Sequence, residues 1–381
     1  MSLMSGDLRI VPVTTPAELD RFIAVAPRLQ AKDPNFIEPL KFERRAALTP
    51  KTNPFFAHAE VQMWLAVRDG HDVGRISAQI DALAPQEGGG RVGHFGMICA
   101  QDDQTLVQAL LATAETWLAE RGCTRVLGPL NLSINEEVGL LVDGFDTPPM
   151  VMMGHDPAWL GPLIEACGYT KARDVYAYLG HMSDDLPEPL RSRVLRGPPA
   201  GVTLRRLDMR RYDAEVRSLT EILNDAWSDN WGFTPTTEAE TAQLASTLKM
   251  VIDPRLTWFA DIDGETAGFI VFLPNINEAI ADLRGRLFPL GWAKLLWRLK
   301  VARVKSIRVP LMGVKKKFQT SRRGQLLPFH LINAAANEAK ALGYERYELS
   351  WILEDNVPMR RILEAIGARI YKTYRVYGRA L

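Results

Sequence analysis

Cysteine is scarce in this chain, and its placement excludes a disulfide scaffold and a cysteine-based metal site. The three cysteines, Cys99, Cys123 and Cys167, are scattered over 381 residues without a metal-ligand spacing. Clusters of cysteine with histidine and the motifs of activated nucleophiles are also missing. We therefore expect a protein of a reducing compartment, located in the cytoplasm, that works without a bound metal.

Long apolar runs and an excess of one charge are missing as well. No apolar run reaches the roughly 20 residues of a membrane span, and the N-terminus lacks a signal-peptide pattern. The net charge of +1 indicates no partner for the chain as a whole. Hydrophobic residues make up 47% of the sequence, so a chain of this length has enough apolar material for two globular domains.

The sequence does contain an internal repeat near the end of each half. Five residues recur at a constant spacing of 199, namely Asp156/Asp355, Glu165/Glu364, Ala166/Ala365, Gly168/Gly367 and Tyr178/Tyr377. Apolar residues at helical spacing precede each glycine, and strand-forming residues follow it. Each half is therefore predicted to end with a helix, a glycine stop and a strand. The two aspartates are interpreted as caps of these helices.

The elements upstream of the repeat also follow one order. Helical patterns end at Gly122 and Gly343, and each is preceded by two strand patterns joined by Asp-Gly, at 69–70 and 263–264. Each half thus reads helix, hairpin, strand, helix, strand, helix, strand. We predict an α/β fold in which a mixed sheet is flanked by helices. The predicted domains are 5–182 and 201–381, joined by a proline-rich, charged linker at 183–200.

The second half contains a basic insertion at 279–306. From Ala279 to Gln325 there are 13 basic residues and one acidic residue, a local charge of +12 that leaves −11 for the rest of the chain. Within Phe288–Lys300, four apolar residues share one helical face, namely Phe288, Trp292, Leu295 and Leu299. This pattern is typical of a helix that contacts a membrane surface. The alternative is a helix packed on its own domain; nucleic acid is the weaker third interpretation, because the aromatic spacing is helical.

The order of elements resembles the GCN5-related N-acetyltransferase (GNAT) superfamily, with two such domains in tandem. The resemblance covers most of the chain and implies that acyl-coenzyme A is a substrate, with its pyrophosphate at the start of the central helix. The C-terminal half matches better, since Asn356, Glu364 and Gly367 fit a later family motif. It is therefore expected to be the acyl-CoA side. The first half is a degenerate helper, in which Asp102 and Asp103 look like helix caps.

The phosphate loop of that family, Arg/Gln-x-x-Gly-x-Gly/Ala, is degraded in this chain. If Arg323 takes the first position, Leu326 and Leu327-Pro328 stand where glycines are usual; a register that begins at Ser321 keeps Gly324. A phosphate site is favoured over a solvated basic loop, because a helix N-terminus disfavours cations unless an anion sits there. The candidate cofactor-binding residues are Gly313, Val314, Lys315, Arg322, Arg323, Gly324, Gln325 and Asn356.

Acyl transfer from a thioester to an amine needs a base for the amine and an acid for the leaving thiolate. The tyrosine that often serves as the acid in the GNAT family is replaced here by Leu363, so that role cannot be carried over. The candidate catalytic residues are Glu348, Glu354, His155 and Tyr377. A lone histidine is more often structural, and a tyrosine on a C-terminal strand usually serves packing.

The tandem order and the segments "NWGFTPTTEAE" and "LPNINEA" resemble the GNAT-type bacterial ceramide synthases. This resemblance implies an N-acyltransferase that moves an acyl group from coenzyme A to a long-chain, sphingoid-type amine. The basic amphipathic segment Phe288–Lys300 predicts a peripheral position at the inner membrane face. The alternatives are a soluble acetyltransferase for small amines, a non-catalytic acyl-CoA-binding tandem scaffold, and an aminoacyl-transfer enzyme that binds RNA.

Overall fold

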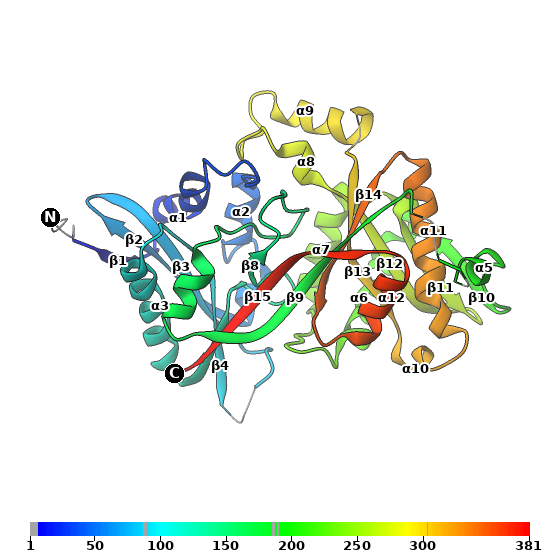
Figure 1. The fold of residues 1–381 in the computed structure, drawn as a ribbon, viewed down its shortest axis with the longest axis horizontal. Helices are drawn as coiled ribbons and strands as arrows, with labels where there is room; N and C mark the ends of the chain where they lie inside the picture. The colour runs from blue at the N-terminus through cyan, green and yellow to red at the C-terminus, as the bar shows by residue number, and fades with distance from the viewer. Residues whose placement is uncertain (1–6, 87–89, 185–186, 189, 303) are drawn as a thin grey trace. The chain divides into compact units, whose positions relative to one another are not determined.

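The computed structural model describes residues 7–381, except 87–89, 185–186, 189 and 303. The chain forms two compact units (Figure 1). Unit 1 comprises Met1–Val175, Ile280–Gly291 and Lys372–Leu381, and unit 2 comprises Tyr176–Ala279 and Trp292–Tyr371. Among the described residues, no helix combines the length and the hydropathy that are needed to cross a bilayer.

The sheet of unit 1 has the order β1-β2-β3-β4-β5-β15. Its strands are β1 (Arg9–Pro12), β2 (Ala59–Arg68), β3 (His71–Asp81), β4 (Arg91–Ala100), β5 (Cys123–Gly128) and the end of β15 (Arg369–Ala380). The pair β4–β5 is parallel, and the other pairs are antiparallel. A further strand, β8 (Leu140–Asp143), also pairs with β15, so the unit has a mixed sheet.

The helices of unit 1 pack on its sheet and bury side chains in two separate hydrophobic clusters. They are α1 (Pro16–Leu29), α2 (Lys41–Ala47), the 3-10 helix η1 (Pro54–Ala57), α3 (Gln104–Ala119) and α4 (Leu160–Ala166). Helix α3 buries Leu106 and Leu110 in one cluster, and α1 buries Phe22 in the other. A capping box between Thr15 and Glu18 satisfies backbone donors at the start of α1, which explains why that helix begins there.

The sheet of unit 2 has the order β9-β14-β13-β12-β11-β10. Its strands are the end of β9 (Thr170–His181), β10 (Val202–Arg206), β11 (Thr257–Ile262), β12 (Glu265–Pro274), β13 (Ser306–Val314) and β14 (Arg346–Leu353). The pair β13–β14 is parallel, while β10 to β13 form antiparallel pairs. Unit 2 therefore repeats the strand plan of unit 1.

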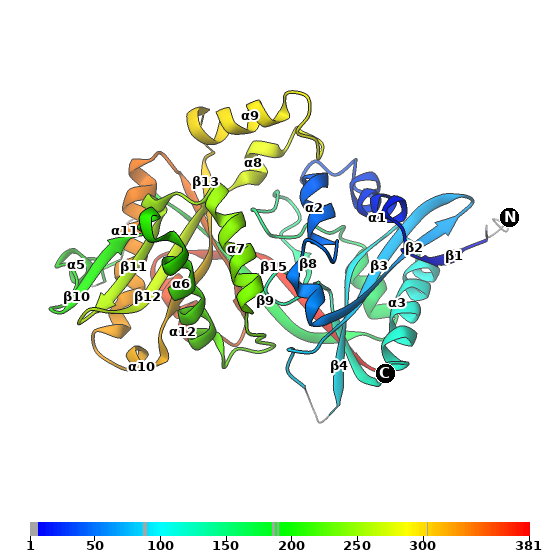
Figure 2. The ribbon, with the colours of Figure 1, turned by 180° about the vertical axis from the view of Figure 1, so that it is seen from behind.

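Two hydrophobic clusters also flank the sheet of unit 2, one with α11 and the other with α6 and α7. The helices are α5 (Leu190–Leu195), α6 (Tyr212–Trp227), α7 (Glu238–Val251), α8 (Ile276–Ile280), α9 (Gly291–Trp297), α10 (Lys316–Gln319), α11 (Leu327–Ala341) and α12 (Val357–Ala365). Short 3-10 helices are η2 (Met209–Arg211), η3 (Pro254–Leu256) and η5 (Gly324–Leu326), and a π-helical turn, η4, covers Arg298–Ala302. Leu331 of α11 is buried in one cluster and Leu219 of α6 in the other. Figures 1 and 2 show the ribbon from opposite sides.

The last strands of the two halves are exchanged between the units. The end of β9, from the first half, belongs to unit 2, and the end of β15, from the second half, belongs to unit 1. Because of this exchange, Tyr178 of the first half lies in unit 2 and Tyr377 of the second half lies in unit 1. In unit 2, the Tyr178 hydroxyl lies 3.3 Å from a Glu364 carboxylate oxygen, and in unit 1 Tyr377 lies 3.2 Å from Glu165. Each half therefore supplies the tyrosine that contacts the repeated glutamate of the other half.

The predicted fold class and hairpins are confirmed. Both residues of each Asp-Gly turn have positive φ, 51° and 77° at 69–70 and 50° and 87° at 263–264, as a type I′ hairpin turn requires. The first strands, β1 and β10, were not predicted, because they are short and lack an apolar alternation. The domain limits 5–182 and 201–381 remain a prediction, and α5 forms within the predicted linker 183–200.

Candidate functional site

The parallel strands β13 and β14 of unit 2 pair only over a short stretch. Ser306–Val309 pairs with Arg346–Leu349, but β13 continues to Val314 and β14 to Leu353. A pocket lies where the strands separate, and its lining includes Trp227, Pro310, Met312, Ser350, Trp351 and Asn356. The facing edges of separated strands offer backbone N–H and C=O groups. The pocket can therefore bind a ligand that carries amide groups of its own.

Trp227 and Asn356 frame this pocket. The Trp227 indole N–H donates to the Met312 carbonyl at 3.3 Å, and its ring centroid lies 6.2 Å from that of Trp351. The Asn356 side chain caps α12 by accepting from the backbone N–H of Met359 at 3.2 Å. The candidate Asn356 thus has a structural role and also lines the pocket.

The loop after β13 leads to a helix start without a side-chain cap. Within the described part of the chain, the N-cap residues of η5 and α11, Arg323 and Leu326, make no side-chain cap hydrogen bond, although Ser321 Oγ accepts from the Gly324 N–H at 3.0 Å. Lys315 pairs with Glu265 at 3.0 Å, and Arg323 pairs with Asp263 at 2.8 Å. Exposed pairs of this kind contribute about 1 kcal/mol or less to stability. An anionic ligand can therefore replace these carboxylates at small cost, next to the positive end of the helix.

The remaining loop candidates mainly shape the backbone. A Cβ atom on Gly324 would lie 1.8 Å from the Phe318 carbonyl oxygen, so only glycine fits there. The N–H of Gln325 donates to the Ser321 carbonyl at 3.0 Å. Arg322 is exposed in the same loop. The loop conformation thus depends on Gly324 whether or not phosphate binds.

Two further candidates lie at the end of β13. A Cβ atom on Gly313 would lie 3.3 Å from side-chain atoms of Ile222 and Phe269, so the glycine lets α6 pack closely on the strand. Val314 continues the ladder opposite Gly268. These two residues position the strand that forms one wall of the pocket.

Glu348 lies in a buried polar network beside the pocket. It pairs with Arg308 across the β13–β14 ladder, with 3.5 Å from Arg308 Nε to a carboxylate oxygen, and the side chains are 0% and 3% exposed. The Ser350 and Tyr371 hydroxyls both donate to the Glu348 carboxylate. Arg308 Nε in turn donates to Ser350 Oγ at 2.8 Å. Since Ser350 also lines the pocket, its hydroxyl connects the pocket with the buried carboxylate.

The other catalytic candidates lie elsewhere. Glu354 is half-buried after β14, and its carbonyl accepts from Arg360 at 2.8 Å. Tyr377 is fully buried in unit 1, where burial raises the pKa of its hydroxyl. The structure places Glu348 and Glu354 in unit 2 and His155 and Tyr377 in unit 1.

His155 forms a dyad with Asp33 in unit 1. Its Nε2 lies 2.9 Å from an Asp33 carboxylate oxygen, and its buried Nδ1 has no hydrogen-bond partner among the residues that the structure describes. Burial lowers the pKa of the imidazole, although the hydrogen bond to Asp33 opposes this shift. With Asp33 ionised, Nε2 carries the proton and Nδ1 keeps a lone pair.

In unit 1, the chain itself fills the place that corresponds to the pocket. Strand β4 pairs with β5 only from Arg91 to His94, but β6 (Leu130–Asn131) then lies against β4. A Cβ atom on Gly96 would lie 2.0 Å from the Leu130 carbonyl oxygen, and Asn131 Oδ1 accepts from the Met97 N–H at 2.7 Å. The extra residues of the first half thus occupy the gap that is open in unit 2.

The start of the central helix, α3 in unit 1 and α11 in unit 2, also differs between the units. Asp103 caps α3, and its carboxylate accepts from the backbone N–H of Leu106 at 3.1 Å. This confirms the predicted cap at Asp103 and not the one at Asp102, and it puts a negative charge where a phosphate would sit. The cap interpretation is wrong for Asp156, which accepts from the N–H of Leu141 instead. It is also wrong for Asp355, because Asn356 is the cap of α12.

Two known proteins are similar to this chain over nearly its full length, while no family model matches it. A Caulobacter vibrioides protein named bacterial ceramide synthase is 65% identical over 378 residues, which cover 99% of this chain and 98% of that protein. The Escherichia coli protein YghO is 44% identical over 364 residues, which cover 96% of this chain and 93% of YghO.

Solved structures show the same fold at low sequence identity. A tandem GNAT protein from the clavulanic acid biosynthesis pathway has a TM-score of 0.57 and 13% identity, with 98% of both chains covered. A GCN5-related N-acetyltransferase from Sphaerobacter thermophilus has a TM-score of 0.53 and 14% identity, with 98% of this chain and 95% of that chain covered. The predicted tandem GNAT fold is therefore confirmed.

Proposed function

Since the chain belongs to the acyltransferase family of the Caulobacter protein named bacterial ceramide synthase, we propose that it transfers an acyl group from coenzyme A to the amine of a long-chain, sphingoid-type lipid. One observation carries the choice of unit 2 for the acyl donor. Unit 2 combines an open gap between β13 and β14 with an uncapped start of α11, whereas unit 1 has both places filled.

The two parts of the unit 2 site suit the two parts of coenzyme A. The amides of the pantetheine arm can pair with the strand edges along the pocket, as a further strand would. The pyrophosphate can take the place of Ser321 Oγ as the acceptor for the Gly324 N–H, at the start of the η5 turn that leads into α11. Arg322, Arg323 and Lys315 then supply positive charge beside the phosphates, in exchange for the exposed pairs with Asp263 and Glu265.

The chemistry requires removal of one proton from the amine and addition of one proton to the thiolate. The amine nitrogen attacks the thioester carbonyl carbon, the C–N bond forms, and the C–S bond then breaks. We assign Ser350 to accept the amine proton while its own hydroxyl proton passes to Glu348. Arg308 holds Ser350 and Glu348 in place for this transfer. The proton on the buried carboxylate can return along the same path to the leaving thiolate.

Calorimetric titration tests the acyl-CoA assignment. We expect one palmitoyl-CoA to bind per chain, and Arg323→Glu to weaken binding by at least about tenfold, because it reverses a charge beside the phosphates. Arg45→Glu is the matched control, since Arg45 makes a similar exposed pair with Asp20 in unit 1. If the wild type binds neither acetyl-CoA nor palmitoyl-CoA, the proposal is wrong.

The acceptor is tested by turnover. Release of free coenzyme A is measured with palmitoyl-CoA and either a sphingoid base or a small primary amine. We expect turnover with the sphingoid base. Efficient turnover of acetyl-CoA with the small amine, and none with the sphingoid base, would support the alternative of a small-amine acetyltransferase.

A further inference from the structure

One short segment of the chain exposes several large apolar side chains to solvent. The exposed fractions are 83% for Phe288, 74% for Leu290, 50% for Trp292, 46% for Leu296, 57% for Trp297 and 65% for Val301. These six residues lie within 14 consecutive positions, whereas single exposed apolar residues elsewhere need no explanation. An exposed group of this kind marks a surface that contacts a partner or a membrane.

The exposed face of α9 differs from the predicted one. Phe288 precedes the helix, and Leu295 and Leu299 are half-buried, so the predicted face through these residues is wrong. The helix instead exposes Trp292, Leu296 and Trp297. Apolar residues occur at helical spacing on two faces of this segment, so the sequence alone does not tell which face is exposed. The packing of α9, which covers only Gly291–Trp297, decides which face is covered.

In unit 1, the loop that carries Phe288 and Leu290 is held in a fixed conformation. The Gly285 carbonyl accepts from the N–H of Lys41 at 3.1 Å, at the start of α2. Gly285 has a φ of 67°, and a Cβ atom there would lie 2.9 Å from the backbone carbonyl oxygen of Pro39. This close approach requires glycine. The exposed apolar side chains are therefore presented by an anchored loop.

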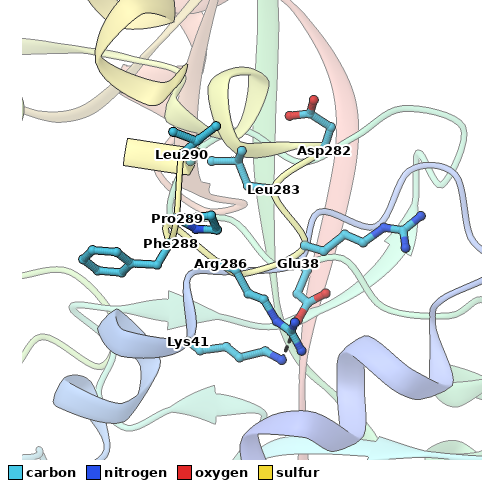
Figure 3. Close-up of a pocket in the computed structure, with 10 residues that line it drawn as sticks. Glu38, Lys41, Asp282, Leu283, Arg286, Phe288, Pro289 and Leu290 are labelled. Atoms are coloured by element: carbon cyan, nitrogen blue, oxygen red, sulfur yellow. Dashed lines mark ion pairs between the residues drawn. The ribbon is translucent and has the colours of Figure 1, made fainter. Parts of the chain in front are cut away.

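A cationic pocket lies beside these side chains in unit 1 (Figure 3). It has a volume of about 640 Å³ and is lined by Lys41, Arg284 and Arg286, together with Phe288 and Leu290. Two acids, Glu38 and Asp282, also line it, and Glu38 pairs with Lys41 at 3.6 Å. Arg284 and Arg286 are both exposed. Figure 3 shows Phe288 pointing away from Lys41 and Arg286.

We propose that this surface docks on a bilayer that contains anionic phospholipid. Phe288 and Leu290 enter the interface between headgroups and acyl chains, as apolar side chains of peripheral anchors do. Arg284 and Arg286 contact the phosphate groups, which attract nearby basic residues. In unit 2, Trp292 and Trp297 of α9 are also exposed, and tryptophan is a residue type that favours such an interface.

Charge favours a lipid surface over a second copy of the chain as the occupant. The stretch 279–300 has five basic residues and one acidic residue, a net charge of +4, so the same stretch of another copy would repel it. An anionic bilayer is complementary in charge and can also take up the apolar side chains. This proposal deepens the proposed function and rests on it, because a long-chain amine must be drawn from a membrane.

Vesicle sedimentation tests the surface. The probes are vesicles of phosphatidylcholine alone and vesicles with about one third phosphatidylglycerol, at low and physiological salt. We expect the wild type to bind the anionic vesicles at least about tenfold more tightly, in a salt-dependent manner. Phe288→Ser with Leu290→Ser lowers binding at both salt concentrations. Arg284→Glu with Arg286→Glu removes the preference for anionic vesicles.

Matched controls lie on α5, where exposed residues of the same types occur. Leu195 is 69% exposed, and Arg191 and Arg193 are exposed in the same helix. Leu195→Ser and the double variant Arg191→Glu with Arg193→Glu are expected to bind vesicles as the wild type does. The proposal is overturned if the wild type binds neither vesicle, if the two loop variants bind like the wild type, or if the exposed face instead produces a dimer in light scattering.

A separate readout distinguishes this surface from the proposed function. Turnover of palmitoyl-CoA with a sphingoid base dissolved in detergent, measured without vesicles, is expected to be equal in the wild type and the loop variants. Vesicle binding without any turnover would contradict the proposed function and leave the surface intact. Turnover with no vesicle binding would contradict only the surface.

Discussion

Unit 1 and unit 2 share one strand plan and differ in what fills the gap after the parallel pair. In unit 1, β6 lies against β4, and Asp103 caps the central helix. In unit 2, the corresponding gap is a pocket, and α11 starts without a side-chain cap. The comparison teaches that a duplicated fold can fill such a gap with its own backbone and cap the central helix with one carboxylate, without a change in architecture.

A second difference between the units lies at equivalent positions of their parallel strand pairs, β13–β14 in unit 2 and β4–β5 in unit 1. Glu348 lies five residues after Gly343, and Leu127 lies five residues after Gly122. Glu348 is opposite Arg308 in unit 2, and Leu127 is opposite His94 in unit 1. A buried ion pair is usually no more stabilising than well-packed apolar residues. The retention of charges at this position in unit 2 therefore favours a functional role for them.

The largest expected effect comes from removing this polar network. Glu348→Gln and Ser350→Ala are each expected to lower turnover by about 10²- to 10⁴-fold, as loss of a general base does. Initial rates with palmitoyl-CoA and a sphingoid base measure the effect, and calorimetry should show acyl-CoA binding within a few-fold of the wild type. Near-normal turnover in Ser350→Ala would contradict the proton path.

Stability must be measured for the same variants. Glu348→Gln leaves Arg308 buried without its charge partner, and breaking such a pair costs about 3–5 kcal/mol. Ser350→Ala keeps the charge pair and is the milder variant. Thermal melting shows whether a loss of turnover in either variant comes from unfolding.

The second-largest expected effect is on the pH dependence of stability. It comes from His94, which takes in β4 of unit 1 the place that Arg308 takes in β13 of unit 2. Burial lowers the pKa of His94 from 6.5 to about 4. The unfolded chain therefore binds the proton first as pH falls, and this residue reduces stability between pH 6.5 and 4. We expect His94→Leu to gain on the order of 3 kcal/mol relative to the wild type when the pH is lowered from 7 to 4.

Denaturant unfolding at several pH values checks this expectation. Asp156, in the same unit, acts in the opposite direction, because burial raises its pKa to about 7 and its folded form takes up a proton first. The difference between the variant and the wild type cancels this contribution. A difference that does not change with pH would show that His94 is not the group that titrates.

Local signals in the sequence were enough to predict much of the fold. The Asp-Gly turns, the glycine at the end of each central helix and the cap at Asp103 depend on residues close together in sequence. The repeat predicted two copies of one plan. It could not predict the exchange of the last strands, because Tyr178 and Tyr377 stand in nearly identical local contexts and only long-range pairing separates them.

The candidate site was predictable only in part. Glu348 and Asn356 were identified from position and motif, and both border the pocket region. Arg308 and Ser350 were missed, because their role depends on the register between β13 and β14, which no local pattern specifies. The closure of unit 1 by Leu130 was also missed, although the extra residues of the first half were a signal that the halves differ there.

The smallest expected effect tests how unit 1 is closed. Asp103→Ala removes the cap of α3 and should lower the free energy of unfolding by about 1 kcal/mol. The neighbouring Asp102→Ala is the control, because Asp102 is exposed and α3 is capped by Asp103. Both variants should still bind one palmitoyl-CoA per chain, since β6 continues to fill the gap beside Gly96. Two bound ligands in Asp103→Ala would mean that the carboxylate alone had kept unit 1 closed.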